Sequence, residues 1–423
     1  MAQALFHKST TACDACGLIT PIPQVAEGHY FNCPRCHHEL VKMPVNAVGN
    51  LISTGLAAFI LLAMSLAFPF LGFSSFGIGQ SITFLDTIVT LLESQSTALG
   101  ILLSLFLLVL PVSYLIIIQL VAWSIKRNTH LAHIGFLLHS LRTIQPWLMI
   151  DVFIIGVLVA LVKLYSLADI SFGLSFWPFC GFVLLLIRTV SLVNQRWLWQ
   201  VVTNHSATQK IEYSLAEKEL LTGCDACGAV VARSASECQQ CGHFVKAPNT
   251  ASLKTTLALL FAAAIMYIPA NIFPIMTTSL LGQAEPSTIL GGVFILWGMG
   301  SYPVAIIILV ASVFVPLAKM LAIAWLCWQS RFPKKKSAHK NLHLYHLTEL
   351  LGRWSMIDIF VVAILTGMVQ LGSIMTIMPA SAALSFATVV ILTMFAAMSF
   401  DSRLLWVNES DSNISKDKGN NFD

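Results

Sequence analysis

The chain has 423 residues, of which 57% are hydrophobic and only 10% are charged. Ordinary soluble domains carry about 25% charged residues, so this composition excludes a water-soluble protein. The formal net charge is only +4, and its uneven distribution along the chain indicates membrane orientation and argues against a nucleic-acid partner.

The first 50 residues are polar and lack the basic region and short apolar run of a signal peptide, so no cleaved leader is expected. Eight of the ten cysteines form four Cys-x-x-Cys pairs, two in this segment and two near the middle of the chain. They are Cys13, Cys16, Cys33, Cys36, Cys224, Cys227, Cys238 and Cys241. Two such pairs place four thiolates around one ion, which predicts two structural zinc sites, with iron or thiol redox chemistry as alternatives. Gly17, Gly228 and Gly242 follow the second cysteine of a pair, where the backbone often needs a positive φ.

Eight apolar segments are long enough to cross a bilayer, which takes about 20 helical residues. We predict these spans at 51–73, 99–125, 147–166, 172–193, 253–276, 302–328, 356–374 and 377–400. Lys and Arg concentrate after the second and sixth spans and in the central link, whereas the loops on the opposite side contain neither. The positive-inside rule therefore predicts that both termini and the central link are cytoplasmic.

The sequence also contains an internal repeat. Residues 145–156 return as 352–363, which aligns Asp151 with Asp358, and a similar shift pairs Arg196 with Arg403. We therefore predict an all-α polytopic membrane protein with two parallel-repeat four-helix units, each preceded by a small zinc ribbon. The predicted regions are a first ribbon at 1–48, a first unit at 49–200, a second ribbon at 201–250, a second unit at 251–407 and a disordered tail at 408–423.

Ionisable side chains inside apolar spans are costly and are therefore candidates for function. Lys319 and Asp358 lie at similar predicted depths in the second unit, and we predict that they interact. Ser312, Ser355 and Thr393 could extend this network by hydrogen bonds. The alternative is a buried ion pair that only fixes helix packing.

The first unit has Tyr114 at the position of Lys319, so the second unit is the better candidate for an active polar network. Asp151 and Lys163 are secondary candidates in the first unit. The alternative is that Asp151 caps its helix or reaches the interface and that Lys163 extends outward to the membrane surface.

Pro269, Asn271 and Pro274 lie near the end of the fifth span, and prolines there can interrupt a helix. Interrupted helices at matching positions of two repeats often mark a transport site. A proline that merely ends its helix is the alternative. The histidine-rich segments that contain His139 and His346 are interpreted as solvated interface, in preference to metal binding or pH sensing.

Four further motifs are YIPANIFPIM at 267–276, PSTIL at 286–290, GSYPV at 300–304 and GRWSMID at 352–358. With these motifs the chain closely resembles the paraquat-inducible protein A family, over nearly its whole length and including both Cys-x-x-Cys pairs of each half. The resemblance implies an inner-membrane component of lipid trafficking across the envelope of Gram-negative bacteria, with a periplasmic MCE-domain partner that forms a tunnel. It also implies a polar network in the second unit, at positions that match Ser312, Lys319, Asp358 and Thr393.

These features together predict a subunit that passes phospholipid or a related amphiphile to or from the MCE-protein tunnel and supports envelope integrity. A non-transporting membrane scaffold that anchors the MCE partner is the alternative. No enzyme is expected, because the sequence has neither a G-x-x-x-x-G-K-[ST] phosphate loop nor an H-E-x-x-H motif.

Overall fold

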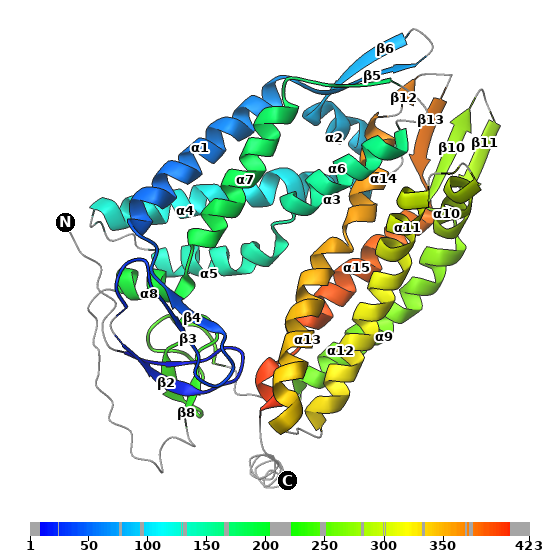
Figure 1. Ribbon diagram of the computed structural model, residues 1–423. Coiled ribbons are helices and arrows are strands. Elements are labelled where there is room, and N and C mark those ends of the chain that lie inside the picture. Colours follow the sequence, from blue (N-terminus) through cyan, green and yellow to red (C-terminus); the bar gives the residue numbers. More distant parts are fainter. Residues whose placement is uncertain are drawn as a thin grey trace.

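The structure is a computed structural model that is mostly helical, with small sheets at one end and two cysteine-rich ribbons at the other (Figure 1). These ends are called the sheet end and the ribbon end below. The described residues are 9–23, 25–75, 78–93, 97–127, 129, 133–164, 169–203, 221–245, 251–280, 283–298, 300, 302–331, 335–368, 370–371 and 375–406. The predicted tail at 408–423 therefore lies outside the described part of the chain.

The first unit begins with α1 (Ala47–Ala67), which packs along α7 (Phe176–Leu192). Helix α1 stops short of the predicted span end because Pro69 disfavours helical geometry at the preceding residue, and Phe68 is extended with φ −120° and ψ 164°. The other helical segments of this unit are α2 (Phe84–Glu93), α3 (Thr97–Ser104), the π-helical η1 (Leu105–Val109), α4 (Leu110–Arg127), α5 (Ile134–Ile144), the 3-10 turn η2 (Gln145–Trp147), α6 (Ile150–Leu164) and α8 (Gln195–Thr203).

The second unit repeats this arrangement, with α9 (Ala251–Ile272) packed along α15 (Ser381–Ser399). Both units carry a π-helical segment at matching places, followed by a helix with proline at its second position, Pro111 in one and Pro316 in the other. The remaining helical segments are α10 (Ile289–Gly298), α11 (Tyr302–Leu309), the π-helical η4 (Val310–Phe314), α12 (Val315–Arg331), α13 (Lys335–Trp354), α14 (Ile357–Met368) and the 3-10 turn η5 (Ser402–Leu405). The internal repeat is thus visible in the fold as well as in the sequence.

Two antiparallel sheets at the sheet end were not predicted. The first has the strand order β6 (Ile78–Thr83), β5 (Pro69–Ser75), β7 (Asp169–Phe172), and the second has β11 (Gln283–Ser287), β10 (Met276–Leu280), β13 (Met375–Pro379), β12 (Gln370–Leu371). The first three strands of the second sheet repeat the order of the first sheet. These strands take up the outer ends of predicted spans such as 51–73 and 356–374, because their apolar residues continue past the helix end and hydropathy alone does not separate strand from helix.

The described residues contain fewer candidate spans than the predicted eight. Six helices of the described chain are long and apolar enough to cross a membrane, or seven if α7 and α8, which meet at 62°, count as one broken span. The predicted span at 356–374 forms α14, which has only 12 residues before the chain turns into strand. Within the described residues, α14 is therefore shorter than the roughly 20 residues that a full crossing needs.

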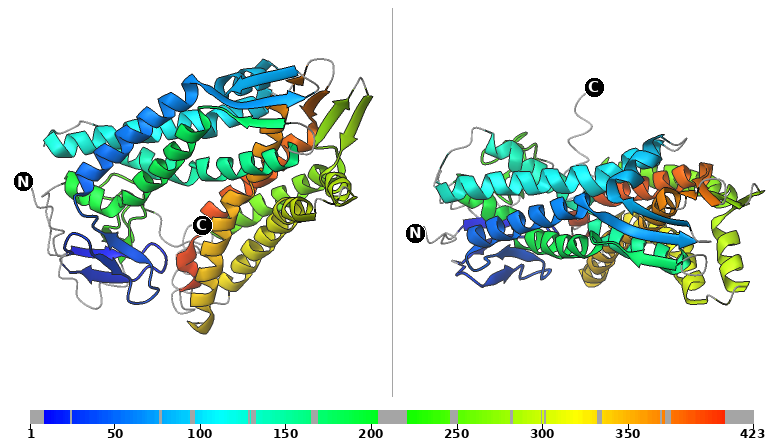
Figure 2. Two further views of the ribbon diagram at one scale, coloured as in Figure 1. Left: turned by 45° about the horizontal axis from the view of Figure 1, so that its top comes forward. Right: turned by 90° about the horizontal axis from the view of Figure 1, so that it is seen from above.

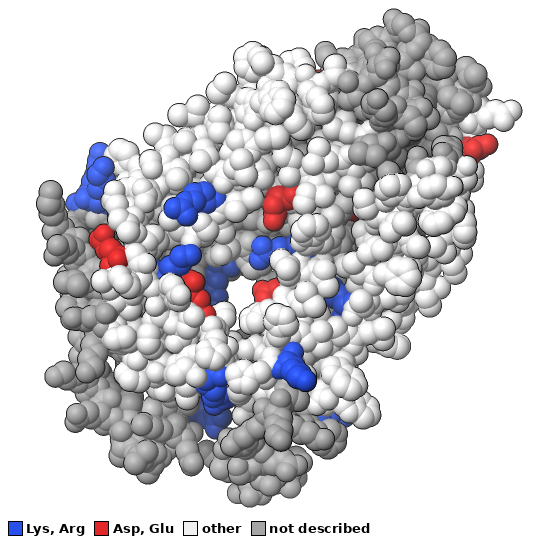
Figure 3. All heavy atoms as spheres, in the orientation of Figure 1, with Lys and Arg blue, Asp and Glu red and all other residues white. Residues whose placement is uncertain are grey.

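The two units meet through α6 and α14, and the ribbons lie side by side at the ribbon end (Figures 1 and 2). The first ribbon contains the hairpins β1 (Ser9–Ala12) with β2 (Ile19–Ile22) and β3 (Tyr30–Asn32) with β4 (Glu39–Lys42). The second contains β8 (Leu221–Gly223) paired with β9 (Val230–Ala232). On the face in Figure 3, most charged side chains gather around a hollow between the units and towards the ribbon end, whereas the rest of the described surface is largely uncharged.

Candidate functional sites

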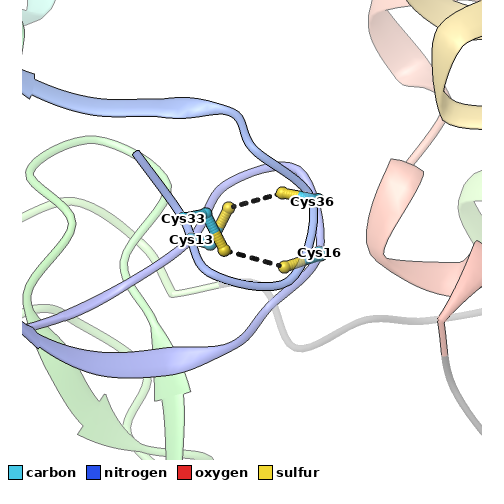
Figure 4. Close-up of side chains that lie close together, drawn as sticks. All are labelled: Cys13, Cys16, Cys33 and Cys36. Atoms are coloured by element: carbon cyan, nitrogen blue, oxygen red, sulfur yellow. Dashed lines mark hydrogen bonds between the residues drawn. The ribbon is translucent and has the colours of Figure 1, made fainter. Parts of the chain in front are cut away.

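The eight paired cysteines form two four-sulfur clusters, one in each ribbon, as predicted. In the first ribbon, the Cys13 and Cys36 sulfurs lie 3.5 Å apart and the Cys16 and Cys33 sulfurs lie 3.6 Å apart (Figure 4). The second ribbon repeats these distances between Cys224 and Cys241 and between Cys227 and Cys238.

The geometry of both clusters fits a tetrahedral metal ion. All four sulfurs of each cluster lie within 4.8 Å of one another, and a tetrahedron with metal–sulfur bonds of about 2.3 Å places its ligands about 3.8 Å apart. The hydrogen bonds between the sulfurs act in opposite directions within each cluster. Those from Cys13 and Cys16 lower the pKa of the Cys36 thiol to about 4, and the one from Cys227 lowers the pKa of the Cys224 thiol to about 6, whereas the pKa values of Cys16 and Cys227 are raised. Thiols with a lowered pKa supply the thiolates that a metal ion binds. A metal ion held by these four protein ligands would have no open coordination position, which is typical of a structural site.

The turns that hold the clusters have the predicted backbone. Gly17, Gly228 and Gly242 have φ values of 73°, 76° and 69°, which confirms the positive φ predicted after the second cysteine. At the fourth such position His37 adopts φ 59°. Histidine is among the few residues that tolerate this region, so the four knuckles share one conformation despite the different residue.

Each ribbon is fixed to its own unit by a buried arginine. In the first half, Arg196 pairs with Asp14 at 2.7 Å and donates to the carbonyl oxygens of Ala12 and Leu40. Because Asp14 lies inside a Cys-x-x-Cys knuckle, the ion pair ties the metal module to the end of the helical unit.

The same contact recurs in the second half, where Arg403 pairs with Asp225 at 2.8 Å and with Asp401 at 2.8 Å. Burial opposes the charge of Arg403, but the hydrogen bond to Asp401 and the charges of Asp401, Asp225 and Asp14 together raise its pKa. Neither the Arg196–Asp14 pair nor the Arg403–Asp225 pair was predicted from the sequence. The available signal was the Cys-Asp-Ala-Cys motif that both ribbons share, together with the repeat that aligns the two arginines.

Lys319 lies on α12 with only 1% of its surface exposed, inside the helices of the second unit. Its ammonium donates a hydrogen bond to Thr393 Oγ1 on α15 at 3.2 Å, and Thr393 donates in turn to the Val390 carbonyl at 2.9 Å. The structure therefore brings together two of the predicted network residues, Lys319 and Thr393.

The other predicted network residues are also buried. Ser312 lies in η4 and is 1% exposed, and Ser355 lies in the turn between α13 and α14 and is 2% exposed. The Ser355 hydroxyl has no hydrogen-bond partner among the described residues. Asp358 is in the first turn of α14 and 8% exposed. Its interaction with Lys319 stays a prediction.

The secondary candidates are placed as follows. Asp151 lies half-buried in the first turn of α6, where its negative charge interacts favourably with the N-terminal end of the helix dipole. Lys163 belongs to α6, but its side chain lies outside the described part. Helix α9 continues through Pro269 to Ile272 and ends before Pro274, so Pro269 does not interrupt it.

Helices α9 and η4 are linked by a residue that was not predicted as a site. Tyr267 Oη donates to the carbonyl oxygen of Val313 at 3.3 Å, and Asn271 donates to the Tyr267 carbonyl at 2.9 Å. Carbonyls of a π-helical segment are often freed from the regular pattern, and such segments are frequent at functional sites. Tyr267 therefore anchors the segment that contains Ser312.

A helical multi-pass membrane protein with two repeated units, each carrying a four-cysteine module, is the class that these features define. The family model described as "Paraquat-inducible protein A" matches residues 49–203 and 253–409, and the chain belongs to this family. It is 37% identical to the "Intermembrane transport protein PqiA" of Escherichia coli (strain K12) over 408 residues, which cover 95% of this chain and 96% of the relative.

More distant relatives have similar coverage. The "Probable intermembrane transport protein" of Haemophilus influenzae is 27% identical over 94% of each chain. The "Lipophilic envelope-spanning tunnel protein A" of E. coli (strain K12) is 25% identical over 93% of this chain and 90% of the relative. No solved structure matches the chain.

Proposed function

We propose that this chain is the inner-membrane subunit of an intermembrane lipid transport system. It passes phospholipid or a related amphiphile to or from a periplasmic tunnel formed by an MCE-domain protein. The names of the relatives support this function, because they describe intermembrane transport and an envelope-spanning tunnel protein. In this proposal both termini and the ribbons face the cytoplasm, as the distribution of Lys and Arg indicates, and the sheet end faces the periplasm.

The observation that carries the proposal is the burial of Lys319 among helices. An ionisable group inside a membrane bundle is costly to bury, and such residues mostly mark transport pathways or proton relays. The matching residue of the first unit is Tyr114, so the charge belongs to one unit only. Proton exchange at Asp358, coupled to Lys319, supplies the energy for lipid movement in this proposal.

The two metal centres hold zinc in this proposal. Four thiolates and tetrahedral spacing suit Zn²⁺, which favours sulfur ligands and has no redox chemistry. The zinc ions stabilise the ribbons, since modules of this size bury too little apolar surface to fold alone. The chain is not an enzyme in this proposal, because its relatives are named for transport and a four-thiolate zinc has no free coordination site.

The test compares matched variants of the two units in purified protein reconstituted into vesicles with a fluorescent phospholipid. Lys319→Met and Asp358→Asn are expected to abolish lipid transfer to an MCE-domain acceptor while the protein stays folded. The controls are Tyr114→Phe and Asp151→Asn, which change the matching positions of the first unit. Tyr114→Phe is expected to be neutral, because the Tyr114 hydroxyl is buried without a hydrogen-bond partner among the described residues.

The alternative function, a scaffold that only anchors the MCE partner, predicts a different outcome. A scaffold tolerates Lys319→Met as long as the variant folds and binds the partner. Wild-type lipid transfer and wild-type envelope resistance in cells that express folded Lys319→Met would therefore reject the transport proposal.

A further inference from the structure

The two ribbons contact each other as well as the helical units. Thr11 of the first ribbon is buried and its hydroxyl donates to the Gly228 carbonyl of the second ribbon at 2.7 Å. The backbone N–H of Ala12 donates to the same oxygen at 3.2 Å. Since Arg196 and Arg403 hold each ribbon to its own unit, the pair of ribbons already forms a continuous link between the units.

The first ribbon also contacts the second unit directly. The imidazole of His38 stacks on that of His346 of α13, with centroids 5.6 Å apart and an interplanar angle of 7°. The guanidinium of Arg35 lies 4.6 Å from the ring centroid of Trp406, which follows η5. Both are contacts between flat groups that a small displacement would break.

The second ribbon makes the matching contact with the first unit. The His243 ring stacks on His139 of α5 with centroids 5.1 Å apart, and His139 Nε2 donates to the Cys241 carbonyl at 3.1 Å. His38 and His243 each lie two residues after the last cysteine of their ribbon, and His139 and His346 match in the repeat. The two stacked pairs therefore arise from one contact that occurs twice, each time between a ribbon and the opposite unit.

This crossing has a mechanical consequence. Figure 3 shows a hollow between the units on the face where the charged side chains gather. A ribbon that contacted only its own unit would move with that unit, whereas ribbons with crossed contacts resist separation of the two units. We propose that the two ribbons form a clasp: the hydrogen bonds between them link the units, and the crossed contacts fix the spacing of the units at the ribbon end, which becomes longer and less uniform when these contacts break. The proposal does not depend on what the protein transports.

The test measures the distance between the units in the full-length protein in lipid nanodiscs. Spin labels are attached through keto-phenylalanine, which spares the cysteines, at Phe136 of α5 and Leu350 of α13, which are 72% and 57% exposed. The double variant His139→Ala/His346→Ala removes both stacks and leaves each ribbon sequence intact. The control His133→Ala/His343→Ala changes one exposed histidine near or on each of the same helices.

The clasp predicts that the double variant shifts the main distance to longer values and broadens its distribution, whereas the control superimposes on the wild type. Metal content is measured in parallel by mass spectrometry and stays at one ion per cluster in both. A wild-type distance distribution in the metal-loaded double variant overturns the proposal. Loss of metal from that variant also overturns it, because the stacks would then stabilise the ribbons themselves instead of joining the units. Arg35→Met, with Arg233→Met as its control, repeats the test without changing a histidine.

Discussion

Phe153 of α6 and Phe360 of α14 occupy matching positions of the repeat and pack edge to face, with ring centroids 5.5 Å apart. Gly156 lies nearly one turn further along α6, and a Cβ at that position would lie 3.2 Å from Phe360 Cβ and 3.6 Å from the Ile357 carbonyl oxygen. The units therefore meet where each contributes the same helix. Glycine permits the close approach, as small residues do in membrane helix pairs.

Replacing Gly156 by Leu is expected to destabilise the protein, because the added side chain must push α14 away or adopt a strained rotamer. Overpacking of this kind costs about 1–3 kcal/mol, which is measured as a lower melting temperature in detergent. Gly292→Leu on α10 is the control, since a Cβ there has no neighbour within 4 Å among the described residues. Equal losses in the two variants would contradict close packing at Gly156.

Gly228 and Gly242 offer a second comparison within one ribbon. Both have positive φ, so alanine at either position carries a similar backbone cost of about 1–2 kcal/mol. A Cβ at Gly228 would also lie 2.8 Å from Thr11 Oγ1 and 2.9 Å from Arg196 Nε, whereas one at Gly242 has no described neighbour within 4 Å. Gly228→Ala is therefore expected to increase hydrogen exchange in both ribbons, and Gly242→Ala only in the second. If Gly228→Ala increased exchange in the second ribbon only, the packing of the first ribbon would not depend on this contact.

The two arginine ion pairs are expected to differ in strength. Arg403→Met leaves Asp225 and Asp401 without their cation at 30% and 16% side-chain exposure, whereas Arg196→Met leaves Asp14 at 48% exposure, where water can solvate it. Breaking a buried pair costs about 3–5 kcal/mol and an exposed pair about 1 kcal/mol or less. SDS titration should therefore show a larger decrease in the free energy of unfolding for Arg403→Met than for Arg196→Met. Adding Asp225→Asn and Asp401→Asn to the Arg403→Met variant should restore part of the lost stability, because the carboxylates that lack a cation are then removed. If stability is not restored, the unpaired carboxylates are not the reason for the loss.

Features that depend on local spacing could be predicted from the sequence. The cysteine pairs fixed both metal clusters, and the glycines after them indicated the turn conformation that Gly17 and Gly228 adopt. Hydropathy found the helices, and the motif around Asp151 and Asp358 revealed the repeat that the structure shows.

Features that depend on distant contacts could not be predicted. The strands β5 and β13 continue the apolar segments of the helices beside them, and each pairs with a strand that is distant in the sequence, β5 with β7 and β13 with β10. The link between Asp14 and Arg196 was hidden for the same reason, because the residues are far apart in sequence and each resembles an ordinary surface charge. At Lys319, the structure shows the predicted burial and one contact within the predicted network, the hydrogen bond to the Thr393 hydroxyl.

A substitution at Gly352, near the end of α13, can displace the Lys319 side chain without replacing the lysine. A Cβ at this position would lie 2.8 Å from Lys319 Nζ and 3.2 Å from its Cε. Alanine should therefore displace the ammonium from Thr393. The strain of a displaced side chain, about 0.5–1.5 kcal/mol, corresponds to a loss of lipid transfer of about two- to twelvefold, measured in the vesicle assay. Gly298→Ala, where a Cβ has no described neighbour within 4 Å, is the control.

The same substitution in a Lys319→Met background decides whether the effect passes through the lysine. If Gly352→Ala acts by moving the ammonium, it adds no further loss once the ammonium is gone, because the two changes remove one interaction. Because Lys319→Met is already expected to abolish lipid transfer, the readout is the melting temperature, and the double variant should match Lys319→Met in this quantity. Additive losses would mean that Gly352 affects the packing of α13 independently, and the buried lysine would lose this support as the centre of the transport site.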